Sequence, residues 1–238
     1  MIDVVRSAQP PKSLQETDAY DGADVRDRLR DDFLGKCYLC EGPLPETFQI
    51  DHFRPQADFP ELKKHWPNLF PAHGETCNRR RLRWGTRGVV VDGRRCAFPE
   101  GGLLNCTNGE DVEQRLVQWL EQDAVRGLRA HFRARSADDT AATNTAEELS
   151  HIHDPGSGGG KEISSLINAQ YVRVLEGHHR LIQAWEAADR DRNDLRVAKA
   201  AEVLRLMLAK NAPYSTLIRD RLQEFVIPTL RPLLGLPA

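Results

Sequence analysis

The 238-residue sequence lacks any apolar run approaching the roughly 20 residues of a membrane-spanning helix. Its N-terminal segment has neither the apolar stretch of a signal peptide nor a small-residue cleavage site, so we expect a cytoplasmic protein with no membrane partner. A formal net charge of −2 argues against a protein that coats nucleic acid over its whole surface. A local basic patch is compatible with that charge.

The sequence has few cysteines, and their number is odd. Five cysteines in a chain without a secretion signal argue against a disulfide framework and direct attention to metal binding. Cys37 and Cys40 form a C-x2-C pair, a spacing that lets two thiolates bind one zinc ion from a single tight turn. A redox pair is the alternative, but such a pair normally opens a helix, whereas the turn-rich stretch EGPLPE follows here.

Two further zinc ligands have to come from another part of the chain. His73 and Cys77, in H-x3-C spacing, supply ligand types that structural zinc sites use. Cys96, Cys106 or water is the alternative for the fourth position. Once His73 is chosen, Cys96 and Cys106 are expected to be buried as small hydrophobic residues. The predicted ligands of a structural Zn²⁺ are Cys37, Cys40, His73 and Cys77.

Composition and hydrophobic periodicity divide the chain into three regions. Residues 1–36 form an arm and a short helix, in which Val25, Leu29 and Phe33 recur every four residues. Residues 37–110 contain all five cysteines and little helical periodicity, which favours short strands and turns. Residues 111–238 begin with RLVQWLE and LRAHFRAR, which predict a hairpin with a helix as the alternative.

Helical periodicity dominates the rest of the C-terminal region. A short helix capped by Thr145 is expected first, followed by a flexible linker at DPGSGGG. Longer helices are predicted over residues 161–189 and 194–210, and a third around Leu217 to Val226. The predicted fold class is therefore α+β, with a small zinc-stabilised module followed by a mainly α-helical bundle.

Four histidines of this region do not suggest a second metal site. They lack carboxylate or cysteine partners at helical spacing, so surface or capping roles are expected. These residues are His151, His153, His178 and His179.

Between the two ligand pairs the chain reads QIDHFRPQ, and the motif residues Asp51, His52, Asn68, Cys77 and Asn78 follow in order. This order, over residues 36–84, resembles the HNH endonuclease family in the variant whose last histidine is replaced by asparagine. The resemblance implies a ββα-metal fold, in which the Asp-His pair ends the first strand and the Cys-Asn pair opens a short helix. His73 departs from the family pattern, since a second C-x2-C pair usually begins there.

Phosphodiester hydrolysis requires a base that activates water and a cation that stabilises charge on the phosphate and the leaving oxygen. His52 suits the base, because histidine exchanges protons near neutral pH. Asp51 and the Asn78 side-chain carbonyl are hard oxygen ligands for a catalytic Mg²⁺ or Mn²⁺. By resemblance, Asn68 or backbone near it would orient His52.

Arginine is concentrated in residues 77–95, where seven arginines and one aspartate give a local charge of 7 − 1 = +6. Arg79, Arg80 and Arg83 are predicted to bind phosphates, and Arg54 either to reach the phosphate or to brace its loop. A solvated face with surface salt bridges is the alternative.

Within the HNH family, the chain is most similar to the nucleases of Septu-type bacterial defence systems. This similarity implies an anti-phage role, DNA as the target with RNA left open, and an ABC-like ATPase partner that the helical C-terminal half binds. The alternative function is a zinc-stabilised module that binds nucleic acid or protein without catalysis. The intact set of Asp51, His52 and Asn78 favours the enzyme, because a binding module has no need of all three.

Overall fold

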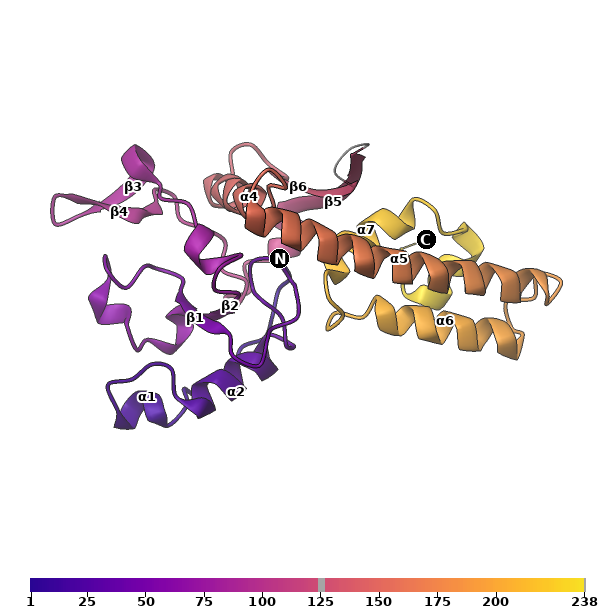
Figure 1. Cartoon of the computed structure of the whole chain (residues 1–238), viewed down its shortest axis with the longest axis horizontal. Helices are drawn as coiled ribbons and strands as arrows, with labels where there is room; N and C mark the ends of the chain where they lie inside the picture. Colours follow the sequence, from indigo (N-terminus) through magenta and orange to yellow (C-terminus); the bar gives the residue numbers. More distant parts are fainter. Residues whose placement is uncertain (124–126, 238) are drawn as a thin grey trace. The chain divides into compact units, whose positions relative to one another are not determined.

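The computed structural model describes residues 1–123 and 127–237, which divide into two compact units. The first unit comprises Met1–Val117 and Phe132–Ile163, and the second comprises Gln118–His131 and Ser164–Ala238. Helices and two-stranded sheets make up both units (Figure 1). Among the described helices, none combines the length and apolar character that crossing a lipid bilayer requires.

The first unit contains the predicted arm and cysteine-rich module together with part of the predicted C-terminal region. The division of the sequence into three regions stays a prediction. The short elements that lead to and surround the module are α1 (Ser13–Glu16), α2 (Ala23–Asp32), α3 (Val112–Arg115) and the 3-10 turns Pro60–Leu62, Trp66–Asn68, Asn78–Arg80 and Gly85–Arg87.

The helix predicted near the N-terminus is confirmed as α2. Val25 and Leu29 are fully buried, and Phe33, just past the end of α2, is nearly so. A spacing of four residues is close to one helical turn, so these side chains lie on one face and reach the same core. The Phe33 ring meets the Phe70 ring edge to face, with centroids 5.4 Å apart.

Two antiparallel ribbons form the sheets of the module: β1 (Gln49–His52) with β2 (Leu69–Ala72), and β3 (Gly88–Val91) with β4 (Arg94–Pro99). In the first ribbon, Asp51 lies opposite Phe70. The Phe70 ring also lies 4.8 Å from the ring of Tyr38 and 5.3 Å from that of Phe53, so it forms the centre of an aromatic core. The Asp-His pair is therefore at the end of a strand whose partner is buried.

The short helix that the HNH resemblance implies after Cys77 is a 3-10 helix of three residues, Asn78–Arg80, and the backbone is extended again by Arg81.

β5 (Leu116–Asp123) and β6 (Gly127–Ala134) pair in a third two-stranded sheet. This pairing decides between the predicted alternatives in favour of a hairpin. Part of the predicted connection, residues 124–126, lies outside the described residues. Residues of β5, β6 and the long helix α5 belong to both units.

The helix predicted to start at Thr145 starts earlier, as α4 (Thr140–Ile152). Asp139 caps it by accepting a hydrogen bond from the Ala142 amide at 3.0 Å. Thr145 lies inside the helix, where its hydroxyl donates to the Ala141 carbonyl at 2.8 Å and accepts from the Leu104 amide at 2.8 Å. The prediction was wrong because the earlier aspartate offers a cap first.

The glycine-rich stretch predicted as a flexible linker is partly helical, since α5 (Gly158–Glu186) begins in it. A Cβ on Gly160 would lie only 1.9 Å from the Asp154 carbonyl oxygen, and one on Gly159 would lie 2.9 Å from Nη1 of Arg80. These glycines therefore permit close packing at a helix start rather than flexibility.

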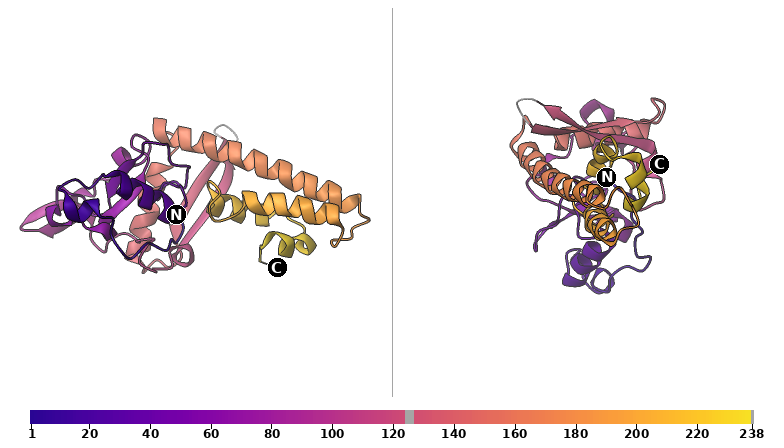
Figure 2. Two further views of the ribbon diagram at one scale, coloured as in Figure 1. Left: turned by 90° about the horizontal axis from the view of Figure 1, so that it is seen from below. Right: turned by 90° about the vertical axis from the view of Figure 1, so that its right-hand side faces the viewer.

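Apart from its part of the β5–β6 hairpin, the second unit is helical, and its remaining helices are α6 (Leu195–Met207), α7 (Ser215–Gln223) and the 3-10 segment Pro228–Leu234. In Figures 1 and 2, α6 runs alongside the C-terminal half of α5. Gly177 of α5 marks the contact, because a Cβ there would lie 3.3 Å from Leu204 and 3.4 Å from the Met207 sulfur. A small residue thus lets the two helices approach closely.

His153 occupies the C-cap position of α4, one of the roles predicted for it, but its side chain is buried. Its ring lies 4.9 Å from the ring of Phe132. Within the described residues, its buried Nδ1 has no hydrogen-bond partner. Burial, which disfavours the charged imidazolium, lowers the pKa of His153 to about 3.

The buried His153 predicts acid sensitivity. Because its pKa is about 3 in the folded chain and about 6.5 in an unfolded chain, the unfolded state binds more protons between these values. The free energy of unfolding should therefore fall as the pH is lowered through this window, by up to about 1.4 kcal/mol per pH unit. Urea unfolding at several pH values should show a shallower dependence for His153→Gln. His151→Gln, on the exposed side of α4, should keep the wild-type dependence, and equal slopes for all three proteins would contradict the assignment.

Candidate functional site

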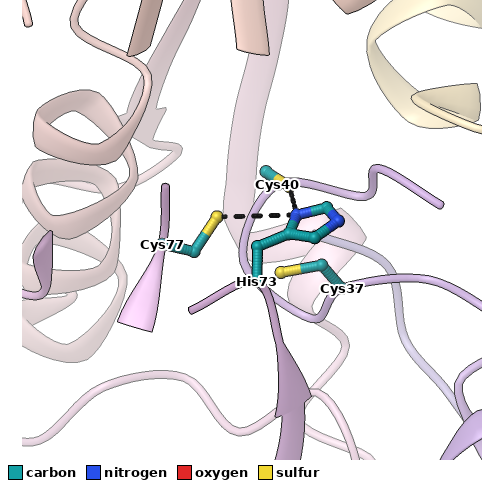
Figure 3. A group of neighbouring side chains, drawn as sticks. All are labelled: Cys37, Cys40, His73 and Cys77. Atoms are coloured by element: carbon teal, nitrogen blue, oxygen red, sulfur yellow. Dashed lines mark hydrogen bonds between the residues drawn. The ribbon is translucent and has the colours of Figure 1, made fainter. Parts of the chain in front are cut away.

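The four predicted zinc ligands come together in the first unit. The ligand atoms of Cys37, Cys40, His73 and Cys77 all lie within 4.8 Å of one another. Figure 3 shows their side chains pointing toward one point, with Nδ1 of His73 3.3 Å from the Cys40 sulfur and 4.0 Å from the Cys77 sulfur. With metal–sulfur bonds of about 2.3 Å, tetrahedral ligands are separated by roughly 3.8 Å. The cluster therefore fits a structural metal ion such as zinc.

Local backbone geometry sets each ligand pair. The Cys37 amide donates to the Gly42 carbonyl at 2.9 Å, which folds the C-x2-C segment into a tight turn. Glu41 closes this turn with a φ of 60°, in the left-handed region. On the other side, the Asn78 amide donates to the His73 carbonyl at 2.8 Å and curls the segment after β2. One ligand pair thus lies shortly before the β1–β2 ribbon and the other directly after it.

Hydrogen bonds around the cluster suit a metal site. The Nε2 atom of His73 lies 2.9 Å from the Pro43 carbonyl, which can only accept, so Nε2 carries a proton and Nδ1 faces the sulfurs. The Gly42 amide donates to the Cys40 sulfur at 3.4 Å. This partner for His73 is the kind of outer contact that orients a metal-bound imidazole.

The thiols of the cluster differ in their pKa values. Burial raises the pKa of Cys37, but hydrogen bonds from Cys40, Cys77 and His73 outweigh it and lower that pKa well below its ordinary value. Hydrogen bonds to Cys37 raise the pKa of Cys40 and that of Cys77. Burial lowers the pKa of His73, but its contacts with Cys37 and Cys40 outweigh this and raise it to about 11. Without a metal the cluster thus holds one thiolate, Cys37, beside a protonated His73, and a metal ion would replace the protons on His73, Cys40 and Cys77.

Cys96 and Cys106, the alternative ligands, are outside the cluster. Both are buried, at 3% and 2% exposure, as expected of small hydrophobic residues. Within the described residues, this cluster is the only group of histidine, cysteine and carboxylate side chains close enough to hold a metal.

A cleft of about 630 Å³ lies beside the β1–β2 ribbon. It brings Asn78 to the adjacent residues Asp51 and His52, and adds Arg79, Arg81 and Arg83 at its wall. Three of the four predicted catalytic residues therefore share one surface with several arginines.

His52 is held with one nitrogen fixed. Its Nε2 lies 3.0 Å from the Lys63 carbonyl, and its ring meets the Tyr20 ring edge to face at 4.7 Å. Because a carbonyl only accepts, neutral His52 carries its proton on Nε2 and keeps Nδ1 as the basic nitrogen. This is the arrangement that a general base requires.

Asn68 lines a different cavity from His52, and no hydrogen bond joins the two side chains within the described residues. The Asn68 side chain accepts from the Arg54 amide at 2.8 Å and donates to the Arg54 and Leu62 carbonyls at 3.1 and 3.4 Å. These bonds hold the segment from Arg54 to Leu62, and Lys63, whose carbonyl lies beside His52, follows it directly. The orienting role of Asn68 that the resemblance implies stays a prediction.

Asp51 is buried, with a side chain 7% exposed. The Tyr38 hydroxyl donates to its Oδ2, and Nη1 of Arg81 lies 3.2 Å from the same oxygen and 3.4 Å from Oδ1. Burial raises the pKa of Asp51, and Arg81 opposes the rise. Asn78, the other predicted ligand of a catalytic cation, donates to the Gln49 side chain at 3.1 Å. Both residues thus offer oxygens to the cleft, but Asp51 is already paired.

The four arginines predicted to bind phosphate have different surroundings. Arg79 is 65% exposed and pairs with Glu75 at 2.7 Å. Arg80 donates to the Ile152 and His151 carbonyls at 2.6 and 2.8 Å and so ties the 3-10 turn to the end of α4. Its guanidinium therefore has a structural role.

Arg83 and Arg54 lie on separate surfaces. Arg83 is exposed at the cleft, and no ion pair or hydrogen bond holds its side chain within the described residues. Arg54 borders a second cavity of about 350 Å³, where its guanidinium lies 5.5 Å from the Phe59 ring and 5.4 Å from the Phe98 ring. Of these two, Arg83 is the one placed beside His52.

Three residues of the site were missed in the sequence: Tyr38, Arg81 and Glu148. Tyr38 lies inside the C-x2-C pair, where it reads as a spacer. Arg81 stands in the arginine run, where no local pattern distinguishes it from its neighbours. Glu148 lies 67 residues from Arg81 and pairs with it at 3.3 Å, a contact that no local pattern predicts.

Zinc binding predicts a metal-dependent stability. Purified protein should contain one zinc ion per chain by elemental analysis, and a strong chelator should lower its thermal midpoint. Cys77→Ser should lose the zinc and destabilise the first unit, because it removes one of four ligands. Cys96→Ser, equally buried, should keep one zinc per chain. Wild-type protein without zinc would refute the site.

Comparisons of the chain with protein-family models, with curated proteins and with solved structures found no match. Functional inference therefore rests on the geometry of the cleft and the metal cluster and on the resemblance of the motif residues.

Proposed function

We propose that the protein is a metal-dependent endonuclease of the HNH type that hydrolyses phosphodiester bonds of DNA. One observation carries the proposal. His52, at the end of β1 and oriented by the Lys63 carbonyl, lines the same cleft as Asp51, Asn78 and the unpaired Arg83. A base, two oxygen ligands and a free cation on one surface are the groups that phosphodiester hydrolysis needs.

In this mechanism, Nδ1 of His52 removes a proton from a water molecule, whose oxygen attacks the phosphorus. The bond from phosphorus to the leaving oxygen breaks, and that oxygen takes up a proton from solvent. The Lys63 carbonyl keeps His52 in the tautomer that can accept the proton. Asn68 closes the loop that positions this carbonyl.

Two kinds of group would neutralise the charge on the phosphate: arginine side chains and a divalent cation. Arg83 can bind a phosphate oxygen without first losing a partner, and Arg79 can do so by giving up an exposed pair with Glu75. A divalent cation, Mg²⁺ or Mn²⁺, held by Asp51 and Asn78 would supply Lewis-acid stabilisation of the leaving oxygen. Structural Zn²⁺ in the cysteine cluster fixes the ribbon that presents Asp51 and His52.

A non-catalytic, zinc-stabilised binding module is the second candidate. The pairing of Asp51 with Arg81 and Tyr38 favours it, because a metal ligand of an enzyme would be expected to face solvent. The fixed tautomer of His52 favours the enzyme, because a binding module gains nothing from orienting a histidine that lines the cleft.

A defence role with an ABC-like ATPase partner follows from the resemblance alone. The second unit offers a surface suited to a protein partner. Leu195 and Leu206 are 67% and 66% exposed on α6, and their separation of 206 − 195 = 11 residues is close to three turns, so they share one face. In this proposal the ATPase docks on these helices and directs the nuclease to phage DNA.

Cleavage should depend on His52. With Mn²⁺ or Mg²⁺ present, and with or without a co-expressed ATPase, His52→Ala should cut plasmid DNA about 10²-fold to 10⁴-fold more slowly, the usual contribution of a general base. Circular dichroism and zinc content should stay as in the wild type. His65→Ala, an exposed histidine of the same loop outside the cleft, should cut normally. Unchanged cleavage by His52→Ala would overturn the mechanism.

Two arginines of the same run should respond differently. Arg83→Ala should weaken binding of a short DNA duplex and reduce the dependence of log affinity on log salt by about 1, with little change in thermal stability. Arg80→Ala should instead destabilise the fold by about 2 kcal/mol, because it removes the hydrogen-bond donor of two carbonyls at the end of α4. Fluorescence anisotropy and thermal unfolding separate the two effects, and a loss of stability in Arg83→Ala alone would contradict the assignment.

A further inference from the structure

Arg81 lines the cleft and donates hydrogen bonds to three consecutive residues, Asp51, His52 and Phe53, where β1 ends. Its Nη1 donates to Asp51 and, at 2.9 Å, to the His52 carbonyl, while Nη2 donates to the Phe53 carbonyl at 3.1 Å. Its Nε donates to Glu148 of α4 at 3.3 Å. The side chain is only 12% exposed but lines the cleft. One guanidinium thus joins the catalytic strand, the following loop and a distant helix.

The charges in this group do not balance. Asp51 and Glu148 contribute two negative charges and Arg81 one positive charge, so the group has a net charge of −1 when all three are ionised. Glu148 is 2% exposed and accepts the Leu82 amide with both oxygens, at 3.3 and 3.2 Å. Burial raises the pKa of Asp51 and of Glu148, and Arg81 opposes the rise in each case. A buried excess of negative charge beside an open cleft favours uptake of a cation.

We propose that Arg81 is a built-in competitor for the cation position at Asp51, so that a divalent cation binds Asp51 only as Arg81 releases it. The inference rests on the proposed function, which places Mg²⁺ or Mn²⁺ at Asp51. A divalent cation bonds a carboxylate oxygen at about 2.0–2.6 Å, and a guanidinium 3.2 Å from the same oxygen would be repelled by it. Because of this repulsion, Arg81 and the cation do not contact Asp51 at the same time, and one replaces the other.

The rest of the structure permits the exchange. Arg81 keeps Glu148 and the Phe53 carbonyl when it leaves Asp51, so its side chain stays anchored. Asp51 keeps the hydrogen bond from Tyr38, which holds its carboxylate in orientation. A nucleic-acid phosphate in the cleft attracts the released guanidinium, so substrate and cation each strengthen the binding of the other. Arg81 thereby weakens the binding of cations at Asp51 until substrate arrives.

The test measures Mn²⁺ binding without nucleic acid, in zinc-saturated protein, from the electron paramagnetic resonance signal of free Mn²⁺. The double variant Arg81→Gln/Glu148→Gln removes the competitor but keeps the net charge of −1 on Asp51. It should bind Mn²⁺ about tenfold more tightly than the wild type, within the usual range of coupling between two sites. In Glu148→Gln alone, Asp51 is the remaining carboxylate paired with Arg81, so this variant should bind Mn²⁺ more weakly than the wild type. Asp51→Asn, in either background, should lose the site.

The chain offers a matched control in the neighbouring pair of Arg87 and Glu147, which lie 2.5 Å apart at the surface and do not line the cleft. Arg87→Gln/Glu147→Gln should leave the Mn²⁺ affinity unchanged. Equal affinity in the wild type and in Arg81→Gln/Glu148→Gln would overturn the inference, and so would tight binding that survives Asp51→Asn.

A measurement on the unaltered protein guards against a variant that fails to fold. In a Mg²⁺ titration followed by nuclear magnetic resonance, the Nε–H signal of Arg81 should shift with the cation, while that of Arg87 should not. An Arg81 signal that stays fixed at saturating Mg²⁺ would refute the exchange. Cleavage that depends on His52 is measured in a separate experiment. If cleavage requires His52 but Mn²⁺ binding does not respond to Arg81, this inference fails and the proposed nuclease does not. If Mn²⁺ exchanges with Arg81 at Asp51 but no cleavage is found, the proposed nuclease fails and this inference does not.

Discussion

The four-residue cysteine–histidine cluster is the constraint on which the β1–β2 ribbon depends. β1 and β2 are four residues long, and a two-stranded ribbon of that size has little stability of its own in water. One pair of ligands precedes β1 and the other follows β2, and Gln49 at the start of β1 pairs with Ala72 at the end of β2, so a metal ion in the cluster would hold this end of the ribbon. His52 lies at the opposite end, and the aromatic core around Phe70 supports the ribbon there.

A second constraint links the ribbon to α4. Arg81 binds the side chain or carbonyl of three consecutive residues at the end of β1 and reaches Glu148 on α4. Arg80 makes a parallel connection to carbonyls at the end of the same helix. These contacts explain why residues 132–163 belong to the same compact unit as the module. A site of this kind is not confined to the segment that carries its motif.

Local patterns in the sequence were sufficient where chemistry or periodicity is local. Ligand type and spacing predicted the metal cluster, and repeated apolar residues predicted α2 and the C-terminal helices. Local patterns failed where a residue far away in the sequence determines the conformation or the burial of a side chain. The glycines before residue 161 look flexible, yet Gly160 is needed because the Asp154 carbonyl leaves no room for a Cβ. Glu148 looks like one more exposed charge on a helix, and only its pairing with Arg81 buries it.

The same limit applies to charge. The local sum of +6 over residues 77–95 suggests a strongly attractive surface for phosphate, but most of these arginines already have acceptors. Their partners within the described residues are Glu75 for Arg79, carbonyls of α4 for Arg80, Asp51 and Glu148 for Arg81, Glu147 for Arg87, Asp58 for Arg94, and carbonyls of Thr86 and Gly88 for Arg95.

Arg83 is the arginine of that run that meets the cleft without a partner, so the resting surface attracts phosphate far less than the residue count implies. In the proposed nuclease, nucleic acid would gain more attraction only by drawing Arg79 and Arg81 away from their carboxylates. The free energy of that binding would be tied to the opening of Asp51, so weak non-specific attraction would be the physical consequence of keeping Asp51 paired at rest.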